Sequence, residues 1–167
     1  MSETYKIMFV CTGNTCRSPM AEGGMRKLLE NKGLDGVDVF SSGTAAASGF
    51  PATQYAIEAA RIWEADITGH RSRPLSSELI DIADIILTMA QSHCQEVVRI
   101  RPEAADKTYL LKNYPRAGCD GDEVDDPIGG SLDMYNQTFV EIGEELGRML
   151  PDITEAIKAK RGGTPGE

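Results

Sequence analysis

Cys11 and Arg17 stand at the two ends of a short polar segment that contains glycine, asparagine and threonine. The backbone amides of such a segment can converge on one point, and a guanidinium can form two hydrogen bonds to phosphate oxygens. We therefore expect an anion to bind here. The same positive environment favours a thiolate over a thiol, so Cys11 should be ionised near neutral pH and act as a nucleophile.

The elements on either side of this segment place it between a strand and a helix. Residues 6–10 read Lys-Ile-Met-Phe-Val, an apolar run typical of a strand buried on both faces of a parallel sheet. Ser18 and Pro19 suit the N-cap and first position of a helix, which we expect over residues 20–31. Two adjacent glycines would weaken this helix by about 1 kcal/mol each, unless close packing requires them. A cysteine and an arginine at this spacing also occur by chance, but their setting favours the anion site.

The rest of the chain alternates between predicted strands and helices. Short apolar runs predict strands over residues 37–40, 85–87 and 109–111. Helical spacing predicts helices over residues 53–63, 76–82, 91–100 and from Ser131 onward, the last with a kink or break at Pro151. Strands that alternate with helices pair in parallel. The predicted fold class is α/β, a three-layer sandwich with a twisted four-stranded parallel sheet, in which ligands bind beyond the carboxyl ends of the strands.

The composition is that of one ordinary globular domain. The 167 residues are 41% hydrophobic and 26% charged, which excludes disordered, collagen-like and disulfide-scaffold proteins. We expect a single folded domain over residues 1–160 and a flexible, glycine-rich tail over residues 161–167. The 17 Lys and Arg against 26 Asp and Glu give a net charge of -9, which disfavours nucleic acid and anionic membranes as partners.

The cysteines bear on the compartment. The chain has four of them, at positions 11, 16, 94 and 119, and no two are spaced as in a Cys-x-x-Cys motif. We expect free thiols rather than a disulfide framework, and no zinc site. The sequence has no apolar segment typical of a signal peptide or a membrane span. These features predict a cytoplasmic protein, which we expect to be a monomer.

Residues 10–22 resemble the phosphate-binding loop of the low-molecular-weight protein tyrosine phosphatases. They read Val-Cys-Thr-Gly-Asn-Thr-Cys-Arg-Ser-Pro-Met-Ala-Glu, and further similarity follows in family order at residues 42–44, 69–73 and 126–131. The resemblance implies a four-stranded parallel sheet flanked by helices, in agreement with the apolar pattern. It also implies that Cys11 is the nucleophile. Around the phosphate it places Thr12, Gly13, Asn14, Thr15, Cys16, Arg17 and Ser18.

A phosphatase of this type also needs a group that protonates the leaving atom. Asp126 precedes a proline in a glycine-rich segment, and the family's general acid lies at the matching Asp-Pro. The resemblance implies two displacements. Cys11 takes the phosphoryl group while Asp126 gives a proton, and water then releases phosphate while Asp126 accepts one. Arg17 and the loop amides stabilise the charge of the transition state, and neither a metal nor a cofactor is needed.

The resemblance assigns further residues to supporting roles. Ser18 would hydrogen-bond the thiolate, although a plain helix N-cap is equally compatible with the sequence. Asn14, Ser42 and His70 match the network that holds the loop in shape, and His70 taken alone reads as a structural histidine. Cys16 would form a reversible disulfide with Cys11 on oxidation, or be a small buried side chain, and both can hold.

Thr15 bears on the choice of substrate. The family usually has isoleucine at this position, and Cys-Thr-Gly-Asn-Thr-Cys-Arg resembles the protein arginine phosphatase branch. A threonine offers less apolar area to a tyrosine ring and suits a slim, polar guanidinium. The segment around Ile128 lacks the adjacent tyrosines of many members, and Phe50 could line the opposite rim. We expect phosphorylated proteins as partners, phosphoarginine favoured over phosphotyrosine, and Tyr135 as a half-buried helix residue.

Two other functions would use the same kind of anion site. An arsenate reductase of this fold needs a close pair of downstream cysteines, which Cys94 and Cys119 do not form. A noncatalytic phosphate-binding module is disfavoured because Cys11, Arg17 and Asp126 occur together. Neither glycine-rich nucleotide-binding motif is present. The sequence therefore predicts a protein phosphatase.

Overall fold

Four parallel strands form the sheet at the centre of the molecule. The computed structural model describes residues 4–162. The strands are β1 (Tyr5–Cys11), β2 (Val37–Gly43), β3 (Ile85–Thr88) and β4 (Thr108–Leu110). They lie in the order β2-β1-β3-β4, and each neighbouring pair is parallel. β1 is therefore a central strand, and Cys11 stands at its carboxyl end.

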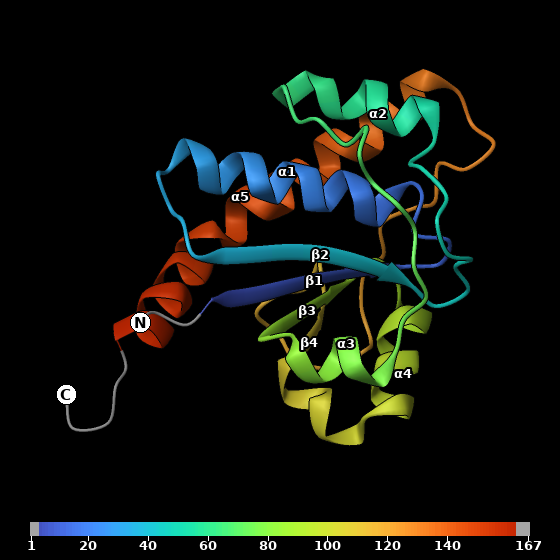
Figure 1. Cartoon of the computed structure of the whole chain (residues 1–167). Helices are drawn as coiled ribbons and strands as arrows, with labels where there is room; N and C mark the ends of the chain where they lie inside the picture. Colours follow the sequence, from blue (N-terminus) through green and yellow to red (C-terminus); the bar gives the residue numbers. More distant parts are fainter. Residues whose placement is uncertain (1–3, 163–167) are drawn as a thin grey trace.

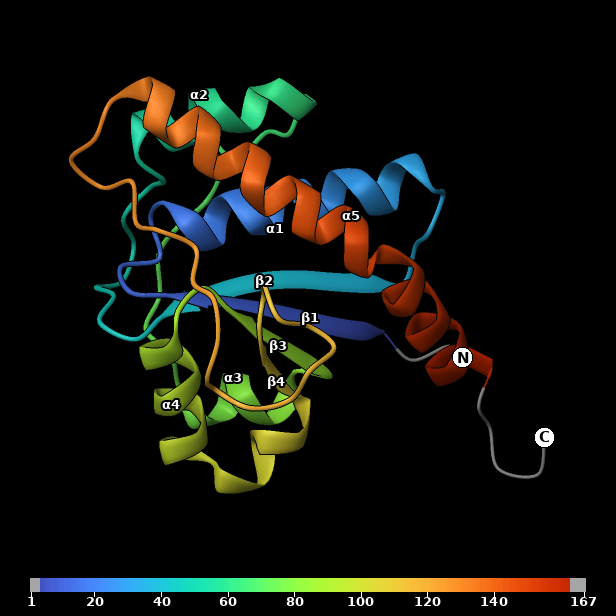
Figure 2. The same ribbon diagram turned by 180° about the vertical axis from the view of Figure 1, so that it is seen from behind.

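Helices cover both faces of the sheet, as Figures 1 and 2 show. One face carries α1 (Arg17–Asn31), α2 (Gln54–Ala60) and α5 (Leu132–Gly162), and a 3-10 helix, η1 (Arg61–Trp63), continues α2. The other face carries α3 (Ser77–Ile82), α4 (Gln91–Ile100) and a second 3-10 helix, η2 (Pro102–Lys107). The predicted three-layer α/β sandwich with a four-stranded parallel sheet is confirmed.

The core consists of two apolar clusters, one on each face, and β1 contributes to both. Ile7 and Phe9 belong to the cluster under α1 and α5, whereas Met8 and Val10 belong to the cluster under α3 and α4. Successive side chains of a strand point to opposite faces, so an apolar run is what a doubly covered strand requires. This packing holds the end of β1, and with it Cys11, in a fixed position.

The first helix starts earlier than predicted. Cys16 is the N-cap residue and α1 begins at Arg17, so Ser18 lies in the first turn and is not the cap. The adjacent glycines of this helix, which are unfavourable in isolation, are explained by packing. A Cβ on Gly23 would lie 2.4 Å from Cγ2 of Ile67, which is closer than two non-bonded carbon atoms can approach. Glycine therefore allows α1 to contact the segment before residues 69–73.

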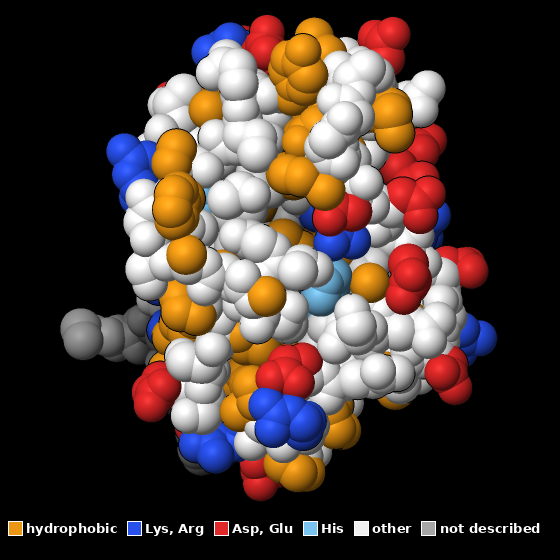
Figure 3. Space-filling model, turned by 90° about the vertical axis from the view of Figure 1, so that its right-hand side faces the viewer, with side chains coloured by type: hydrophobic (Ala, Val, Ile, Leu, Met, Phe, Trp, Pro, Cys, Tyr) orange, Lys and Arg blue, Asp and Glu red, His pale blue; other side chains and the backbone are white. Residues whose placement is uncertain are grey.

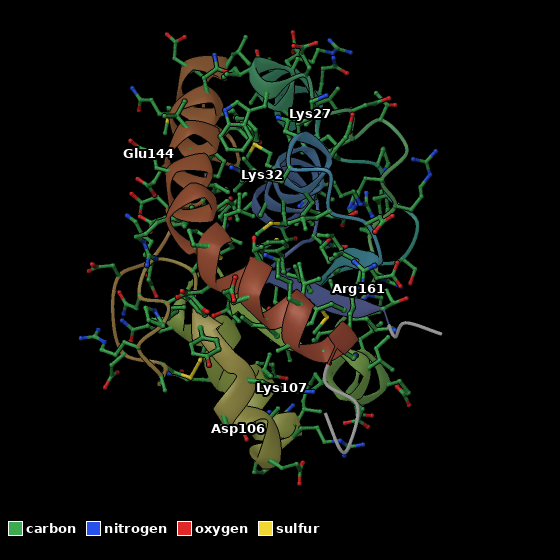
Figure 4. All side chains as sticks on the ribbon, turned by 90° about the vertical axis from the view of Figure 1, so that its left-hand side faces the viewer. Lys27, Lys32, Asp106, Lys107, Glu144 and Arg161 are labelled. Atoms are coloured by element: carbon green, nitrogen blue, oxygen red, sulfur yellow. A yellow bond between two sulfur atoms is a disulfide. The ribbon has the colours of Figure 1, made fainter. Side chains whose placement is uncertain are left out.

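The last helix does not break at Pro151, which lies inside α5. An internal proline removes one backbone hydrogen bond and costs a helix about 3 kcal/mol. The neighbours Leu150 and Ile153 are buried in the core under α5, and this packing keeps the helix continuous. α5 also ends at Gly162, two residues beyond the predicted boundary. Near this end, Arg161, which Figure 4 labels, donates a hydrogen bond to the carbonyl of Asp35. Residues 163–167 of the predicted tail lie outside the described residues.

The expectation of free thiols is wrong for two of the four cysteines. Cys94 of α4 and Cys119, in the segment after β4, form a disulfide, whereas Cys11 and Cys16 are free. The fold brings the first turn of α4 to within 5.5 Å of that segment, measured between the two Cα atoms, although 25 positions separate the cysteines in sequence. Within residues 4–162, none of the helices combines the length and apolar character that crossing a bilayer requires.

Candidate active site

The predicted anion site is the loop between β1 and α1. Asn14 adopts a left-handed backbone conformation, with φ of 57°, which asparagine tolerates better than most residues. This turn directs the backbone N–H of Asn14 to Sγ of Cys11, at 3.3 Å. The hydroxyl of Ser18 also lies 2.9 Å from Sγ. The thiol thus sits among hydrogen-bond donors, as the sequence predicts.

Arg17 supplies the cation of the site. Its side chain is almost fully buried, and Nη1 donates to the carbonyl of Val124 at 2.9 Å. Nη2 lies 3.4 Å from Oγ1 of Thr12 and 3.5 Å from Oδ2 of Asp126. Nε is buried and has no hydrogen-bond partner among residues 4–162. Because a buried unpaired donor is unfavourable, this edge of the guanidinium is suited to an anionic ligand.

A cavity of about 220 Å³ joins the loop to the predicted general acid. Its walls are formed by Cys11, Thr12, Gly13, Thr15, Cys16, Arg17, Asp126 and Ile128. Asp126 is partly exposed, and its Oδ1 accepts a hydrogen bond from the N–H of Ile128, which orients the carboxyl group. Figure 3 shows the face on which the strands end, where acidic and basic side chains gather beside a shallow hollow. The structure therefore brings Cys11, Arg17 and Asp126 together.

A second and larger cavity, of about 570 Å³, contains none of these three residues. Arg26 and Arg73 line it, together with Ser41 and His70. It lies behind the phosphate loop, among the residues that support the loop. We assign the chemistry to the smaller cavity because the nucleophile, the cation and the acid all face it.

Asn14 is the centre of the network that supports the loop. Its side chain is fully buried, and Nδ2 donates to Oγ of Ser18 at 2.8 Å and to Oγ of Ser41 at 2.9 Å. Its Oδ1 accepts from the N–H of Arg73, and its carbonyl contacts Nε2 of His70 at 2.7 Å. His70 thus contacts the loop as the resemblance implies. Asn14 ties the loop to β2 and to residues 69–73.

Ser42, which the resemblance placed in this network, lies outside it. Adjacent residues of a strand point to opposite faces, and Oγ of Ser42 points to Sδ of Met8, at 3.4 Å. Ser41 contacts Asn14 instead, and it donates in turn to Oε1 of Glu22 at 2.6 Å. The prediction was wrong by one position because the two serines are adjacent and both are buried.

Ser18 contacts the nucleophile instead of capping the helix. Its Oγ accepts a hydrogen bond from Nδ2 of Asn14, so its own proton is free to be donated to Sγ of Cys11. The hydroxyl of Ser18 is therefore directed at the sulfur that the sequence identifies as the candidate nucleophile. Of the two alternatives that the sequence left open, the thiolate contact is the one present.

The end of β2 approaches the loop closely enough to require glycine. A Cβ on Gly43 would lie 2.4 Å from the carbonyl oxygen of Thr12. The next two residues donate backbone hydrogen bonds to the loop, Thr44 to the carbonyl of Cys11 and Ala45 to that of Thr12, both at 2.9 Å. This contact fixes the loop backbone and leaves its amides free to face the cavity.

Cys16 and Tyr135 form a contact beside the cavity. The Tyr135 hydroxyl lies 3.3 Å from Sγ of Cys16, and Oγ1 of Thr53 lies 3.6 Å from the same sulfur. Tyr135 is 3% exposed, so it is buried rather than half-buried as predicted. Burial raises the pKa of Tyr135 to about 12, and the phenol is therefore neutral at physiological pH. It can donate its proton to the sulfur.

Two of the three predicted specificity residues line the cavity. Thr15 and Ile128 belong to its walls. Phe50 does not, and its side chain is 57% exposed. The N–H of Ser72 donates to the carbonyl of Phe50, so the backbone of this residue pairs with the segment that follows His70. Phe50 is thus absent from the cavity walls, and its position at the opposite rim stays a prediction.

Sequence analysis missed a histidine beside the loop. His93 is 1% exposed and lies in the first turn of α4. Its Nδ1 accepts a hydrogen bond from the N–H of Ala90 at 3.0 Å, and its Nε2 lies 2.8 Å from Oγ1 of Thr12. Burial, aided by the charge of Arg17, lowers the pKa of His93 to about 4. The one signal for it was its position just after the third predicted strand, at the edge of the sheet where ligands bind.

Comparisons with known proteins agree with this geometry. Residues 6–161 match the family model described as low molecular weight phosphotyrosine protein phosphatase. A protein of Bacillus subtilis named protein-arginine-phosphatase is 46% identical over 156 residues, which cover 93% of this chain and 98% of that protein. A protein of the same name from Geobacillus stearothermophilus is 43% identical over 165 residues, covering 94% of this chain and 99% of the relative.

A solved structure supports the same relationship. The YwlE arginine phosphatase, in a mutant with a phosphorylated active-site serine, superposes with a TM-score of 0.80 at 38% identity. The match covers 89% of this chain and 95% of that one. With the family model matching nearly the whole chain, this protein belongs to the low-molecular-weight phosphotyrosine protein phosphatase family.

Proposed function

We propose that this protein is a protein-arginine phosphatase that works through a phosphocysteine intermediate. The observation that carries the substrate assignment is the cavity wall at Thr15, a polar residue beside Cys11 and Asp126. Two relatives above 40% identity over most of the chain are named for this activity. Phosphoarginine has a narrow, polar leaving group, to which the hydroxyl of Thr15 in the cavity wall can offer a hydrogen bond.

In the first step, the thiolate of Cys11 attacks phosphorus and the bond from phosphorus to the guanidinium nitrogen breaks. Asp126 gives its proton to the departing nitrogen, so the arginine of the substrate leaves as its guanidinium cation. The Nε and Nη2 edge of Arg17, with the loop amides, binds the phosphoryl oxygens on which the negative charge lies. The buried, unpaired Nε supports this role because an anion satisfies it.

In the second step, water attacks phosphorus and Asp126 accepts its proton while the bond from phosphorus to sulfur breaks. The leaving thiolate is stabilised by the hydroxyl of Ser18, which lies 2.9 Å from the sulfur. Asn14 keeps this hydroxyl oriented because Oγ of Ser18 accepts from its amide. Inorganic phosphate and the free enzyme are the products.

Phosphotyrosine is the second candidate substrate. The observation in its favour is Ile128, which lines the cavity and is 57% exposed, because an exposed aliphatic side chain can contact a phenol ring. Arsenate reduction and simple phosphate binding are less well supported, since neither uses an acid at the position of Asp126. We also propose that the enzyme acts as a cytoplasmic monomer and that Cys16 protects Cys11 by reversible pairing on oxidation.

The test compares peptides of one sequence that carry phosphoarginine or phosphotyrosine. The proposal predicts a higher kcat/KM for phosphoarginine in the wild type, and loss of both activities by about 10³-fold or more in Cys11→Ser. An acid quench during turnover should trap one phosphoryl group on Cys11. A Cys11→Ser variant with wild-type activity would exclude the mechanism, and a higher kcat/KM for phosphotyrosine would exclude the substrate.

A further inference from the structure

The buried ring of His93 has one defined protonation state. Its Nδ1 accepts the N–H of Ala90, so Nδ1 carries no proton. The ring is 1% exposed, and the nearby guanidinium of Arg17 further disfavours a second proton. His93 is therefore neutral with its proton on Nε2. It must donate to the atom that Nε2 contacts, which is Oγ1 of Thr12 at 2.8 Å.

Thr12 consequently receives two hydrogen bonds. Nε2 of His93 donates one, and Nη2 of Arg17, at 3.4 Å, donates the other. A hydroxyl oxygen has two lone pairs and one proton. With both lone pairs occupied, Thr12 can act only as a donor. Its side chain lines the cavity next to Cys11, so this donor is available to a group bound there.

We propose that His93 is a positioning residue, which holds the hydroxyl of Thr12 as a proton donor to an oxygen of the transferring phosphoryl group. The inference rests on the proposed phosphatase function. It adds to that function a side-chain donor that joins the loop amides and Arg17. Because the three phosphoryl oxygens take up their equatorial arrangement only in the transition state, a donor aimed at that arrangement should affect kcat more than KM.

The role of His93 also explains why this residue is a histidine. A glutamine or glutamate at this position of a helix can accept the N–H of the N-cap residue, as Nδ1 does here. The second ring nitrogen, on the far side of the imidazole, reaches Thr12 at the same time. Asparagine can keep the first contact, but it is too short to keep the second.

The test is a double-mutant cycle with Thr12→Val and His93→Asn, measured on para-nitrophenyl phosphate. We expect about tenfold lower kcat in each single variant, since one charge-assisted hydrogen bond is lost, and no further decrease in the double variant. In Thr12→Ser, which keeps a hydroxyl, His93→Asn should still lower kcat. Thr138→Val is the matched control, because its hydroxyl bonds only within α5.

The cycle separates positioning from a merely structural role. The proposal is overturned if His93→Asn lowers kcat by the same factor in the wild-type background and in the Thr12→Val background. It is also overturned if Thr12→Val alone has wild-type kcat. Unfolding curves of all variants show which are folded. If His93→Asn does not fold, Thr12→Val alone decides, through the predicted decrease in kcat.

A binding measurement distinguishes failure of this inference from failure of the proposed function. Vanadate and inorganic phosphate bind the same loop without turnover, and vanadate resembles the transition state. The inference predicts that Thr12→Val and His93→Asn weaken vanadate binding more than phosphate binding, with the same lack of additivity. This result would stand even if the wild type hydrolysed neither phosphopeptide, and additive losses would overturn the inference even in an active phosphatase.

Discussion

Nη2 of Arg17 lies 3.5 Å from Oδ2 of Asp126, so the cation that we propose binds the phosphoryl group also pairs with the proposed general acid. The carboxylate and a phosphate compete for the same guanidinium. Charge on Asp126 therefore weakens anion binding, while its proton is needed for the leaving group.

This ion pair predicts that Asp126→Asn lowers the turnover rate but strengthens the binding of phosphate. We expect kcat on phosphopeptides to decrease by about 10²- to 10³-fold, because the leaving atom is no longer protonated. Inorganic phosphate should inhibit the same variant several-fold more strongly, since the competing negative charge is gone. Steady-state kinetics with phosphate as competitive inhibitor measures both. Weaker phosphate inhibition in Asp126→Asn would contradict the pairing.

The adjacent serines of β2 provide a matched pair of variants. Ser41→Ala removes the link between Asn14 and Glu22 and leaves buried polar groups unpaired, so kcat/KM should decrease about tenfold. Ser42→Ala, which removes only a contact to Met8, should have nearly wild-type kinetics. Assays of the two variants under identical conditions test the assignment, and a larger loss in Ser42→Ala would reverse it.

The unfolding free energy should depend on pH through His93. Its pKa falls from the usual 6.5 to about 4 in the folded protein, because the ring is buried beside Arg17, with Asp126 opposing. Between these values the unfolded chain binds a proton that the folded chain does not, so stability decreases as pH falls. The full shift corresponds to about 3 kcal/mol.

Denaturant unfolding at several pH values between 4 and 7 measures this effect. His93→Gln keeps an acceptor for the N–H of Ala90 and cannot titrate. The loss of unfolding free energy between pH 7 and pH 4 should therefore be smaller in this variant than in the wild type, by about 3 kcal/mol. The same slope in the wild type and in His93→Gln would show that His93 is not the group responsible.

The disulfide between Cys94 and Cys119 can be counted chemically. Thiol titration of the denatured protein without reductant should find two free thiols per chain, Cys11 and Cys16. Reduction should lower the unfolding free energy by about 3 kcal/mol, because it releases a closed loop of 25 residues. Cys94→Ser should be equally destabilised and insensitive to reductant. Four titratable thiols in the oxidised wild type would disprove the pairing.

Sequence patterns identified the elements of the fold because each strand and helix carries its own local signal. The apolar run of β1, the loop motif and the alternation of strands with helices are all readable over short windows. Contacts between residues that are far apart in the sequence cannot be read from such short windows. Thr12 and His93 are 81 positions apart, and only the fold makes them neighbours. The same holds for Cys94 and Cys119, which become neighbours only because the segment after β4 folds back to contact α4.

Two further differences from the sequence analysis have local causes. Ser41 and Ser42 are both buried, so the usual alternation of polar and apolar residues does not show which of them faces α1. Pro151 predicts a kink or a break, and burial of its neighbours keeps the helix continuous, which excludes the break. The candidate nucleophile and cation were found because one dense motif carries both, and the candidate acid was found because it precedes a proline in a glycine-rich segment that matches the family. Their supporting residues are scattered over β2, α4 and residues 69–73.

The central claim is that Thr15 makes the cavity selective for phosphoarginine. The most direct measurement is the ratio of kcat/KM for phosphoarginine to that for phosphotyrosine, on one peptide sequence, in the wild type and in Thr15→Ile. We expect a ratio above one in the wild type, and a decrease of about tenfold or more in Thr15→Ile, because the wall loses the hydroxyl of Thr15 and gains apolar area. Equal ratios in the two proteins would contradict the account.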